Sequence, residues 1–231
     1  MTQTDFDLLV KEIKLAYASS DIKKRYADEK GLNWHWDVCT RIIPHSALIL
    51  GFNPGAKDKE CYKPQMEPCN EGFLDVCNGR NGHDAGSLSR LLSYLGKYPK
   101  FFPQSVIEQM GQANYCFFRS QNAGQISDKD LLLCQPIFRR FLAIARPSMI
   151  LCVSSRAQGF LVESGMVSAE SLVESPPFIF HKGQTTVEYH SKTGLILLDN
   201  KKVPVYFLPH PNYRIPTDVR ERAWAFCFGT E

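Results

Sequence analysis

The sequence predicts an α/β fold, a three-layer α/β/α arrangement with a central, mainly parallel four-stranded sheet. Four short apolar runs alternate along the chain with segments in which apolar residues recur at helical spacing. Strands that are apolar throughout are typical of parallel sheets that are covered on both faces. The sequence has no internal repeat and no linker-like segment, so we expect one domain over residues 1–231.

The strands are predicted from runs of apolar residues bounded by turn residues. These runs lie at 47–50, 113–118, 149–153 and 203–208. Three further short segments predict a small antiparallel excursion, because turn residues at 182–183 and 193–194 separate them. These segments lie at 178–180, 185–189 and 195–198.

The covering helices are predicted from apolar residues at helical spacing. They lie at 5–18, 87–95, 127–146 and 154–163, and from 217 towards the C-terminus, where Thr217 or Asp218 is the expected cap. Ser127 and Asp130 have the spacing of a capping box, and Pro136 is expected to kink the same helix. Residues 56–86 have no sustained periodicity, so we expect a long functional loop there.

The composition describes a globular protein with a sizeable core, because 44% of the 231 residues are hydrophobic and 22% are charged. The net charge of +3 permits nucleic-acid binding without requiring it. The N-terminus is charged where a secretion signal would be apolar, and no apolar run is long enough for a membrane span. We therefore expect a monomer without membrane contact, cytoplasmic in a bacterium or nuclear in a eukaryote.

Polar side chains follow the ends of the first and last predicted strands. Asn53 lies in an Asn-Pro-Gly turn directly after the first strand, and His210 lies in a Pro-His-Pro sequence after the last one. Because the carboxyl ends of parallel strands meet at one edge of a sheet, both side chains are expected to face a common crevice. Asn114 opens the second predicted strand, and this position fits the same crevice less well.

Three segments resemble signature motifs of the uracil-DNA glycosylase superfamily. The segment GFNPG (51–55) is similar to the form found in the mismatch-specific, thymine-DNA and single-strand-selective branches. The segment HPNYR (210–214) is similar to the second family motif, and ANYCFFRS (113–120) looks like the middle strand. The resemblance implies a uracil-DNA glycosylase-like fold and a DNA glycosylase of base-excision repair. Such an enzyme hydrolyses the N-glycosidic bond of a flipped uracil, or of a related deaminated base, in single- or double-stranded DNA.

The resemblance also implies a role for the matched residues. His210 would donate a hydrogen bond to O2 of the departing base, and Asn53 would position the attacking water. Asn114 would read the N3–O4 edge of uracil, because its amide has both a donor and an acceptor. Phe52 and Gly55 would belong to the base-binding site.

Two of these residues predict how fast the enzyme is and how large a base it accepts. Asn53 stands where other branches have Asp and supplies no charge to offset the cationic sugar, so we expect a slow enzyme. Gly55 stands where strict uracil enzymes place a bulky Tyr, so the pocket is expected to stay open to thymine or larger bases. The base-stacking aromatic is expected to be Phe73, with Tyr62 as the second choice.

The segment after the histidine is expected to contact DNA. Asn212 would bind a phosphate, Tyr213 adjoins it, and Arg214 falls where the family inserts a wedge side chain into the duplex. No lysine in the motifs is placed to attack the sugar, which predicts a monofunctional enzyme that leaves the backbone uncut.

Neither a metal nor a cofactor is expected. Cys61, Cys69, Cys77 and His83 crowd one loop, but their separations are not those of zinc sites, and no cysteine group has an iron–sulfur pattern. Two other functions remain open. One is a non-catalytic protein that binds nucleic acid or a modified base on the same fold, and the other is a hydrolase of free nucleosides or nucleotides.

Overall fold

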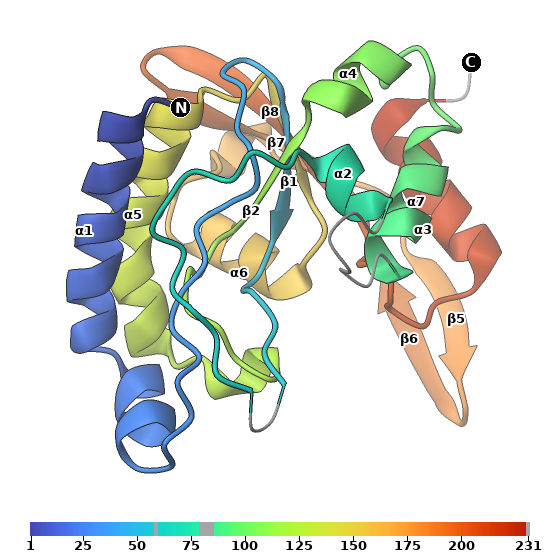
Figure 1. Cartoon of the computed structure of the whole chain (residues 1–231). Helices are drawn as coiled ribbons and strands as arrows, with labels where there is room; N and C mark the ends of the chain where they lie inside the picture. Colours follow the sequence, from blue (N-terminus) through green and yellow to red (C-terminus); the bar gives the residue numbers. More distant parts are fainter. Residues whose placement is uncertain (58–59, 79–85, 230–231) are drawn as a thin grey trace.

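The core of the fold is one six-stranded sheet. The structure is a computed structural model that describes residues 1–57, 60–78 and 86–229. Its strands are β1 (Ala47–Gly51), β2 (Gly111–Asn114), β3 (Met149–Cys152), β4 (Val173–Glu174), β7 (Lys192–Leu198) and β8 (Lys201–Phe207). They lie in the order β2-β1-β3-β8-β7-β4 (Figure 1). The first four in this order run parallel, and β7 and β4 extend the sheet antiparallel at one edge.

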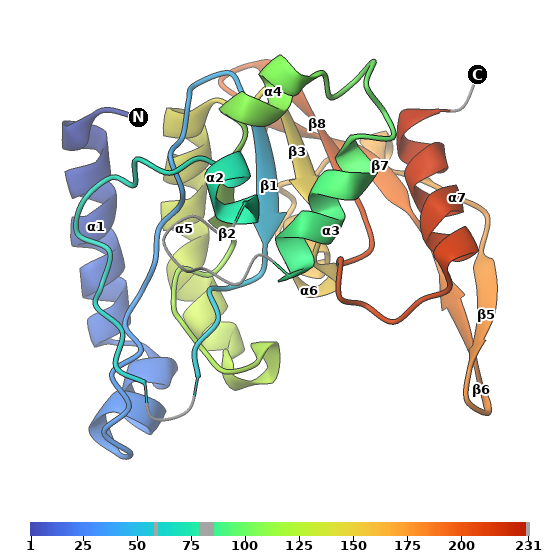
Figure 2. The ribbon, with the colours of Figure 1, turned by 45° about the vertical axis from the view of Figure 1, so that its right-hand side comes forward.

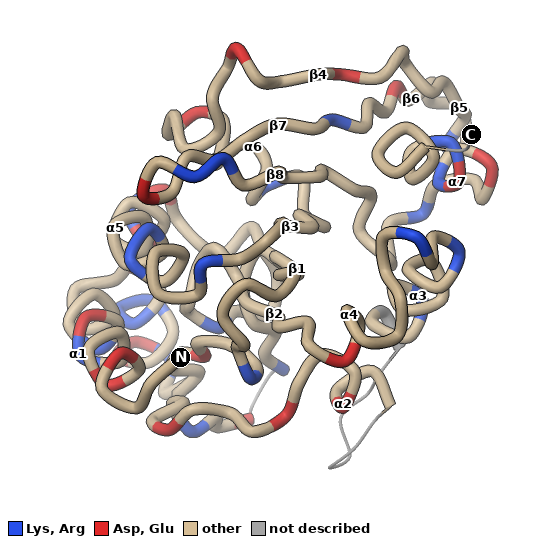
Figure 3. The backbone as a smooth tube through the Cα atoms, turned by 90° about the horizontal axis from the view of Figure 1, so that it is seen from above, with Lys and Arg blue, Asp and Glu red and all other residues tan. Residues whose placement is uncertain are grey.

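Helices cover both faces of this sheet (Figure 2). One face carries α1 (Gln3–Ala18), α5 (Asp128–Ala145) and α6 (Ser155–Glu163). The other face carries α2 (Phe73–Cys77), α3 (Gly86–Leu95), α4 (Gln104–Gln109) and α7 (Thr217–Phe228). A short π-helix lies at Lys23–Asp28 (η1), and short 3₁₀-helices lie at Ala123–Gln125 (η3) and Ala169–Ser171 (η4). Seen from above, the strands stand in order between the layer of α1 and α5 and the layer of α3, α4 and α7 (Figure 3).

The alternation of side chains along β1 explains the two layers. Leu48 and Leu50 pack into the core beneath α1 and α5, whereas Ala47 and Ile49 pack into the core beneath α2, α3 and α7. A central strand that is buried on both faces must be apolar throughout, as this run is. The prediction of a mainly parallel sheet between helices is therefore confirmed.

The sheet has six strands where the sequence predicts four, because β7 belongs to this sheet and not to the antiparallel excursion, and because the two-residue strand β4 is not predicted from the sequence. Strand β7 pairs with β8 from Lys192 opposite Phe207 to Leu198 opposite Lys201. Asp199 and Asn200 join the two strands with φ values of 46° and 65°, which is the backbone of a tight two-residue hairpin turn. The excursion is reduced to one separate hairpin, formed by β5 (Phe178–Lys182) and β6 (Thr185–Tyr189).

Other boundaries also differ from those predicted. The second strand ends at Asn114 instead of continuing to Phe118, and α5 runs as one helix through Pro136. Ser127 caps α5 and Ser154 caps α6, as the sequence indicates, but the residue that precedes α7 is Pro216, which offers no side-chain cap.

The predicted loop 56–86 contains the short helix α2, which the sequence pattern does not predict. Residues 58–59 and 79–85 of that loop lie outside the described part of the chain. No helix among the described residues is long and apolar enough to cross a membrane.

Candidate functional site

A pocket of about 340 Å³ opens where the parallel strands end. Phe52 and Asn53 reach it from the turn after β1, and Asn114 reaches it from the last position of β2. Ser154 follows β3, and His210 follows β8. Asn53 and His210 therefore lie in the common crevice that their strand positions predict.

Asn114 lines this pocket because β2 ends earlier than the sequence suggests. In the sheet Asn114 is the partner of Gly51, the last residue of β1. A Cβ atom on Gly51 would collide with Oδ1 of Asn114, so the absence of a side chain at position 51 makes room for this amide. Within the described residues, no side-chain or backbone group forms a hydrogen bond with the Asn114 amide. Both its donor and its acceptor are thus free to bind a ligand.

Asn53 is held by its amide nitrogen. Nδ2 donates to the carbonyl oxygens of Pro54 (2.9 Å) and Phe118 (3.3 Å) and to Oγ of Ser120 (2.8 Å). Ser120 is buried, and its own hydroxyl donates to the carbonyl of Asn122 at 2.8 Å. Because carbonyl oxygens only accept, they fix which side of the Asn53 amide is nitrogen. Oδ1, which is an acceptor, is left to act in the pocket.

His210 is held as a neutral imidazole with a defined tautomer. The backbone N–H of Asn212 donates to Nδ1 at 3.1 Å, so the proton of the neutral ring lies on Nε2. His210 is exposed, but neighbouring atoms crowd its ring. This desolvation, followed by the positive charge of Arg220, lowers the pKa of His210 below its ordinary value of 6.5. At neutral pH the side chain is therefore a hydrogen-bond donor at Nε2 without a positive charge.

Arg220 of α7 anchors the loop that carries His210. Its buried guanidinium donates to the carbonyl oxygens of His210 (3.0 Å), Tyr213 (2.6 Å) and Pro209 (3.4 Å), and it lies 5.7 Å from the centre of the Tyr94 ring. The sequence motifs do not predict a role for Arg220. The one available signal is that Arg220 falls on the helix face whose other members are apolar.

The other predicted site residues fall into two groups. Phe73, the expected base-stacking residue, is fully buried in the core beneath α3 and α7 and does not line this pocket, so it is not placed to stack on a base. Asn212, Tyr213 and Arg214 are exposed on the loop after His210, as a DNA contact requires. Oδ1 of Asn212 accepts a hydrogen bond from Arg90 at 3.3 Å.

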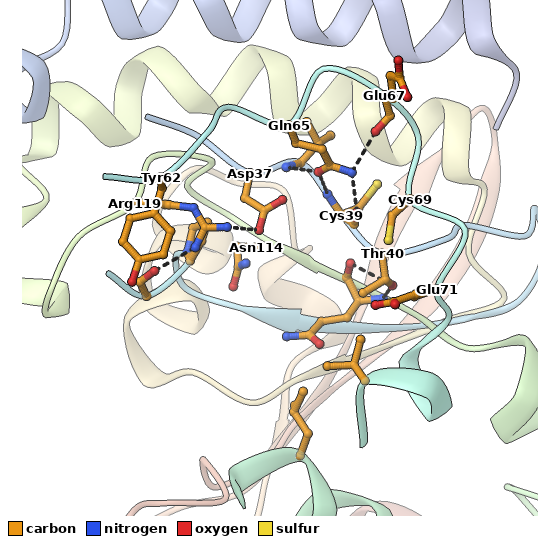
Figure 4. Close-up of a pocket in the computed structure, with 16 residues that line it drawn as sticks. Asp37, Cys39, Thr40, Tyr62, Gln65, Glu67, Cys69, Glu71, Asn114 and Arg119 are labelled. Atoms are coloured by element: carbon orange, nitrogen blue, oxygen red, sulfur yellow. Dashed lines mark hydrogen bonds and ion pairs between the residues drawn. The ribbon is translucent and has the colours of Figure 1, made fainter. Parts of the chain in front are cut away.

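A second, larger pocket of about 590 Å³ adjoins the first, and Asn114 lines both (Figure 4). Arg119 crosses it, donating to Asp37 at 2.6 Å and to the carbonyl of Gly55 at 2.8 Å, with its guanidinium 4.7 Å from the centre of the Tyr62 ring. A Cβ atom added to Gly55 would meet no atom within 4 Å. Gly55 therefore leaves open space on the wall of the larger pocket, which Asn114 also lines.

The structure describes three of the four residues that crowd the predicted loop, namely Cys61, Cys69 and Cys77. Burial raises the pKa of the Cys77 thiol to about 12, and burial also raises the pKa of Cys69. In the ranges 1–57, 60–78 and 86–229, no group of three or more His, Cys, Asp or Glu residues is placed to share a metal ion. His83, which the sequence analysis considered with them, lies outside the described residues.

The two pockets combine fixed hydrogen-bonding groups of different kinds. The smaller pocket presents a donor at Nε2 of His210, an acceptor at Oδ1 of Asn53, and both kinds at Asn114. This arrangement suits a flat polar ligand that carries donors and acceptors along its edge. A comparison with models of known protein families and with curated proteins gave no match to this chain.

Proposed function

We propose that this protein is a monofunctional DNA glycosylase with a uracil-DNA glycosylase-like fold. It hydrolyses the N-glycosidic bond of a flipped uracil, or of a related deaminated base, in DNA. The observation that carries this proposal is the convergence of Asn53, Asn114 and His210 on one pocket at the carboxyl ends of parallel strands. No cofactor takes part in the proposed reaction.

Each of the three residues has a defined task in this reaction. The flipped base places its N3–H and O4 against the Asn114 amide, which accepts from one and donates to the other. As the N1–C1′ bond breaks, its electron pair leaves with the base, and Nε2–H of His210 donates to the O2 atom on which charge develops. Oδ1 of Asn53 accepts a hydrogen bond from the water whose oxygen joins C1′. Since an amide is not a base, the water proton passes to the base anion or to solvent.

The direct test is alkaline cleavage of labelled oligonucleotides after incubation with the purified protein. The panel contains uracil, hypoxanthine, xanthine and 5-substituted uracils, each in single strands and opposite each normal base. Abasic sites at one or more of these bases are the expected result. Binding without cleavage would instead favour a non-catalytic reader of nucleic acid. Release of bases from free nucleosides alone would favour a nucleoside hydrolase, and either outcome would overturn the proposal.

Ser120 is expected to act through Asn53. Ser120→Ala removes one of three acceptors from Nδ2 of Asn53, a hydrogen bond worth roughly 1 kcal/mol, so kcat should fall about fivefold. KM should stay unchanged, because the water and not the base is affected. Single-turnover and steady-state excision rates measure this split. Ser20→Ala is the matched control, since Ser20 is equally buried and donates to a backbone carbonyl far from the pocket. A parallel change in KM would contradict the assignment.

Gly55 is expected to determine how large a base is accepted. Gly55→Tyr would place a bulky ring in the open space of the larger pocket, and a base substituent forced against that ring would cost about 1–3 kcal/mol. Excision of 5-hydroxymethyluracil should therefore fall roughly 10- to 100-fold relative to excision of uracil. Competition between the two substrates in one reaction measures the ratio, and Gly55→Ala should give an intermediate value. If Gly55→Tyr left the ratio of 5-hydroxymethyluracil to uracil excision unchanged, the hydroxymethyl group of the base would not lie near position 55.

A further inference from the structure

We propose that the β5–β6 hairpin is a second DNA-contacting arm. Lys182 at its tip binds the phosphate backbone on one side of the flipped nucleotide. The inference rests on the proposed glycosylase function and adds to it a surface that none of the three motif segments contains. The hairpin lies outside the main sheet, and it projects on the side of the molecule where β1 ends (Figures 1 and 2).

The hairpin is fixed in place by its apolar face. Phe178 and Phe180 are buried against Val219 and Ala223 of α7, the helix whose Arg220 anchors the His210 loop. An isolated two-stranded hairpin is marginally stable in water, so this packing is what orders the arm. The same helix thus positions both the hairpin and the loop.

Alternation along β5 directs Lys182 towards the loop. Residues 178, 180 and 182 share one face of the strand, so Lys182 continues the face of the two buried phenylalanines. Its Nζ lies 5.8 Å from the centre of the Tyr213 ring, and Tyr213 directly precedes Arg214. The tip of the hairpin therefore meets the loop at the residues expected to contact DNA.

The chemistry of this surface matches a nucleic-acid backbone. Lys182 is exposed and forms no ion pair with any described residue, and the tip sequence HKGQTT contains no acidic residue. Tyr213 beside it is 40% exposed, and Ile179, on the opposite face of β5, is 55% exposed. Arg222 of α7 lies 5.1 Å from the centre of the Phe178 ring at the base of the hairpin. Free positive charge next to exposed aromatic and apolar surface is typical of proteins that hold single or opened strands.

The length of the hairpin sets the size of the expected contact. Five-residue strands at about 3.4 Å per residue extend roughly 17 Å. Each strand of B-DNA has one phosphate per 3.4 Å or so, which corresponds to about five nucleotides. The arm should therefore require a flank of about five nucleotides on one side of the target base only.

The test measures DNA binding separately from excision. Fluorescence anisotropy with a duplex that carries a stable abasic-site analogue gives Kd over a range of salt concentrations for wild type and Lys182→Gln. Loss of one phosphate contact should weaken binding about threefold at low salt and reduce the slope of log Kd against log salt by about 0.9. Shortening the flank on the hairpin side below five nucleotides should abolish the difference between the two proteins. Lys201→Gln is the matched control and should bind DNA as wild type does, because Lys201 begins β8 whereas the His210 loop follows its other end.

The outcomes separate this inference from the proposed function. If wild type excises a base but Lys182→Gln keeps the wild-type affinity and salt slope, the arm does not bind DNA and the glycosylase assignment stands. If wild type binds DNA with the expected dependence on Lys182 but excises no base, the arm is supported and the glycosylase assignment fails. If wild type binds no DNA, both fail.

Discussion

His210→Ala is expected to lower the rate constant of base excision by about 10²- to 10³-fold, the usual loss when one donor to a developing anion is removed. The neutral ring offers Nε2–H at the pocket because its Nδ1 already accepts from the backbone N–H of Asn212. Single-turnover excision of the best substrate of the panel measures the loss. His45→Asn is the control, because His45 lies away from the pocket and has a positive φ of 67° that Asn tolerates. A loss below about tenfold would exclude His210 from transition-state stabilisation.

The pH profile tests the same assignment without a mutation. The pKa of His210 is lowered by desolvation and by Arg220, so its ring stays neutral below the ordinary value of 6.5. The excision rate should therefore remain constant as the pH falls through 6.5. It should decline only when the lowered pKa is reached, because protonation of Nδ1 removes the acceptor of the Asn212 N–H. A profile that rises on acidification would mean that the cationic form is the active one.

Arg220→Met is expected to lower the free energy of unfolding by about 2–4 kcal/mol, since backbone carbonyls in a buried place lose a charged donor. Excision should fall as well, because the His210 loop loses its attachment to α7. Chemical denaturation followed by circular dichroism measures the stability.

Two variants on the same helix serve as controls for Arg220. Arg220→Lys keeps the charge but cannot reach three carbonyls at once, so its stability should be intermediate. Arg222→Met removes an exposed arginine with one ion pair, to Asp218, and should change stability by less than about 1 kcal/mol. A stability of Arg220→Met equal to that of wild type would show that the loop does not depend on this anchor.

The sequence was sufficient to predict the parallel strands because their apolar runs are short, separate and bounded by turn residues. The placement of Asn53 and His210 at one edge followed from this, since each comes directly after a buried strand. The strand that ends in Asn114 is predicted too late in the sequence because residues 115–118 are also apolar, and each of them is at most 1% exposed. They leave the sheet to fill the core beneath α5, and an apolar run does not distinguish these two kinds of burial.

The remaining differences have equally specific causes. The spacing of Phe73 from the first motif gives no information about which way its side chain points, and α2 turns it into the core. The turn at Asp199 and Asn200 was overlooked because these residues adopt positive φ less readily than glycine does. The role of Arg220 is not predicted because its partners are backbone carbonyls, which leave no pattern in the side-chain sequence; its place on an apolar helix face is the one signal.

The fit between Gly51 and Asn114 links two residues of different motifs. Gly51 does not have a positive φ, so any residue could adopt its backbone conformation. A residue with a side chain is excluded at position 51 because its Cβ atom would collide with Asn114. A larger residue at position 51 would displace the side-chain amide of Asn114. A smaller residue at position 114 would remove the contact that requires glycine at position 51. In related sequences the two positions should therefore change together: glycine at position 51 should occur with asparagine at position 114.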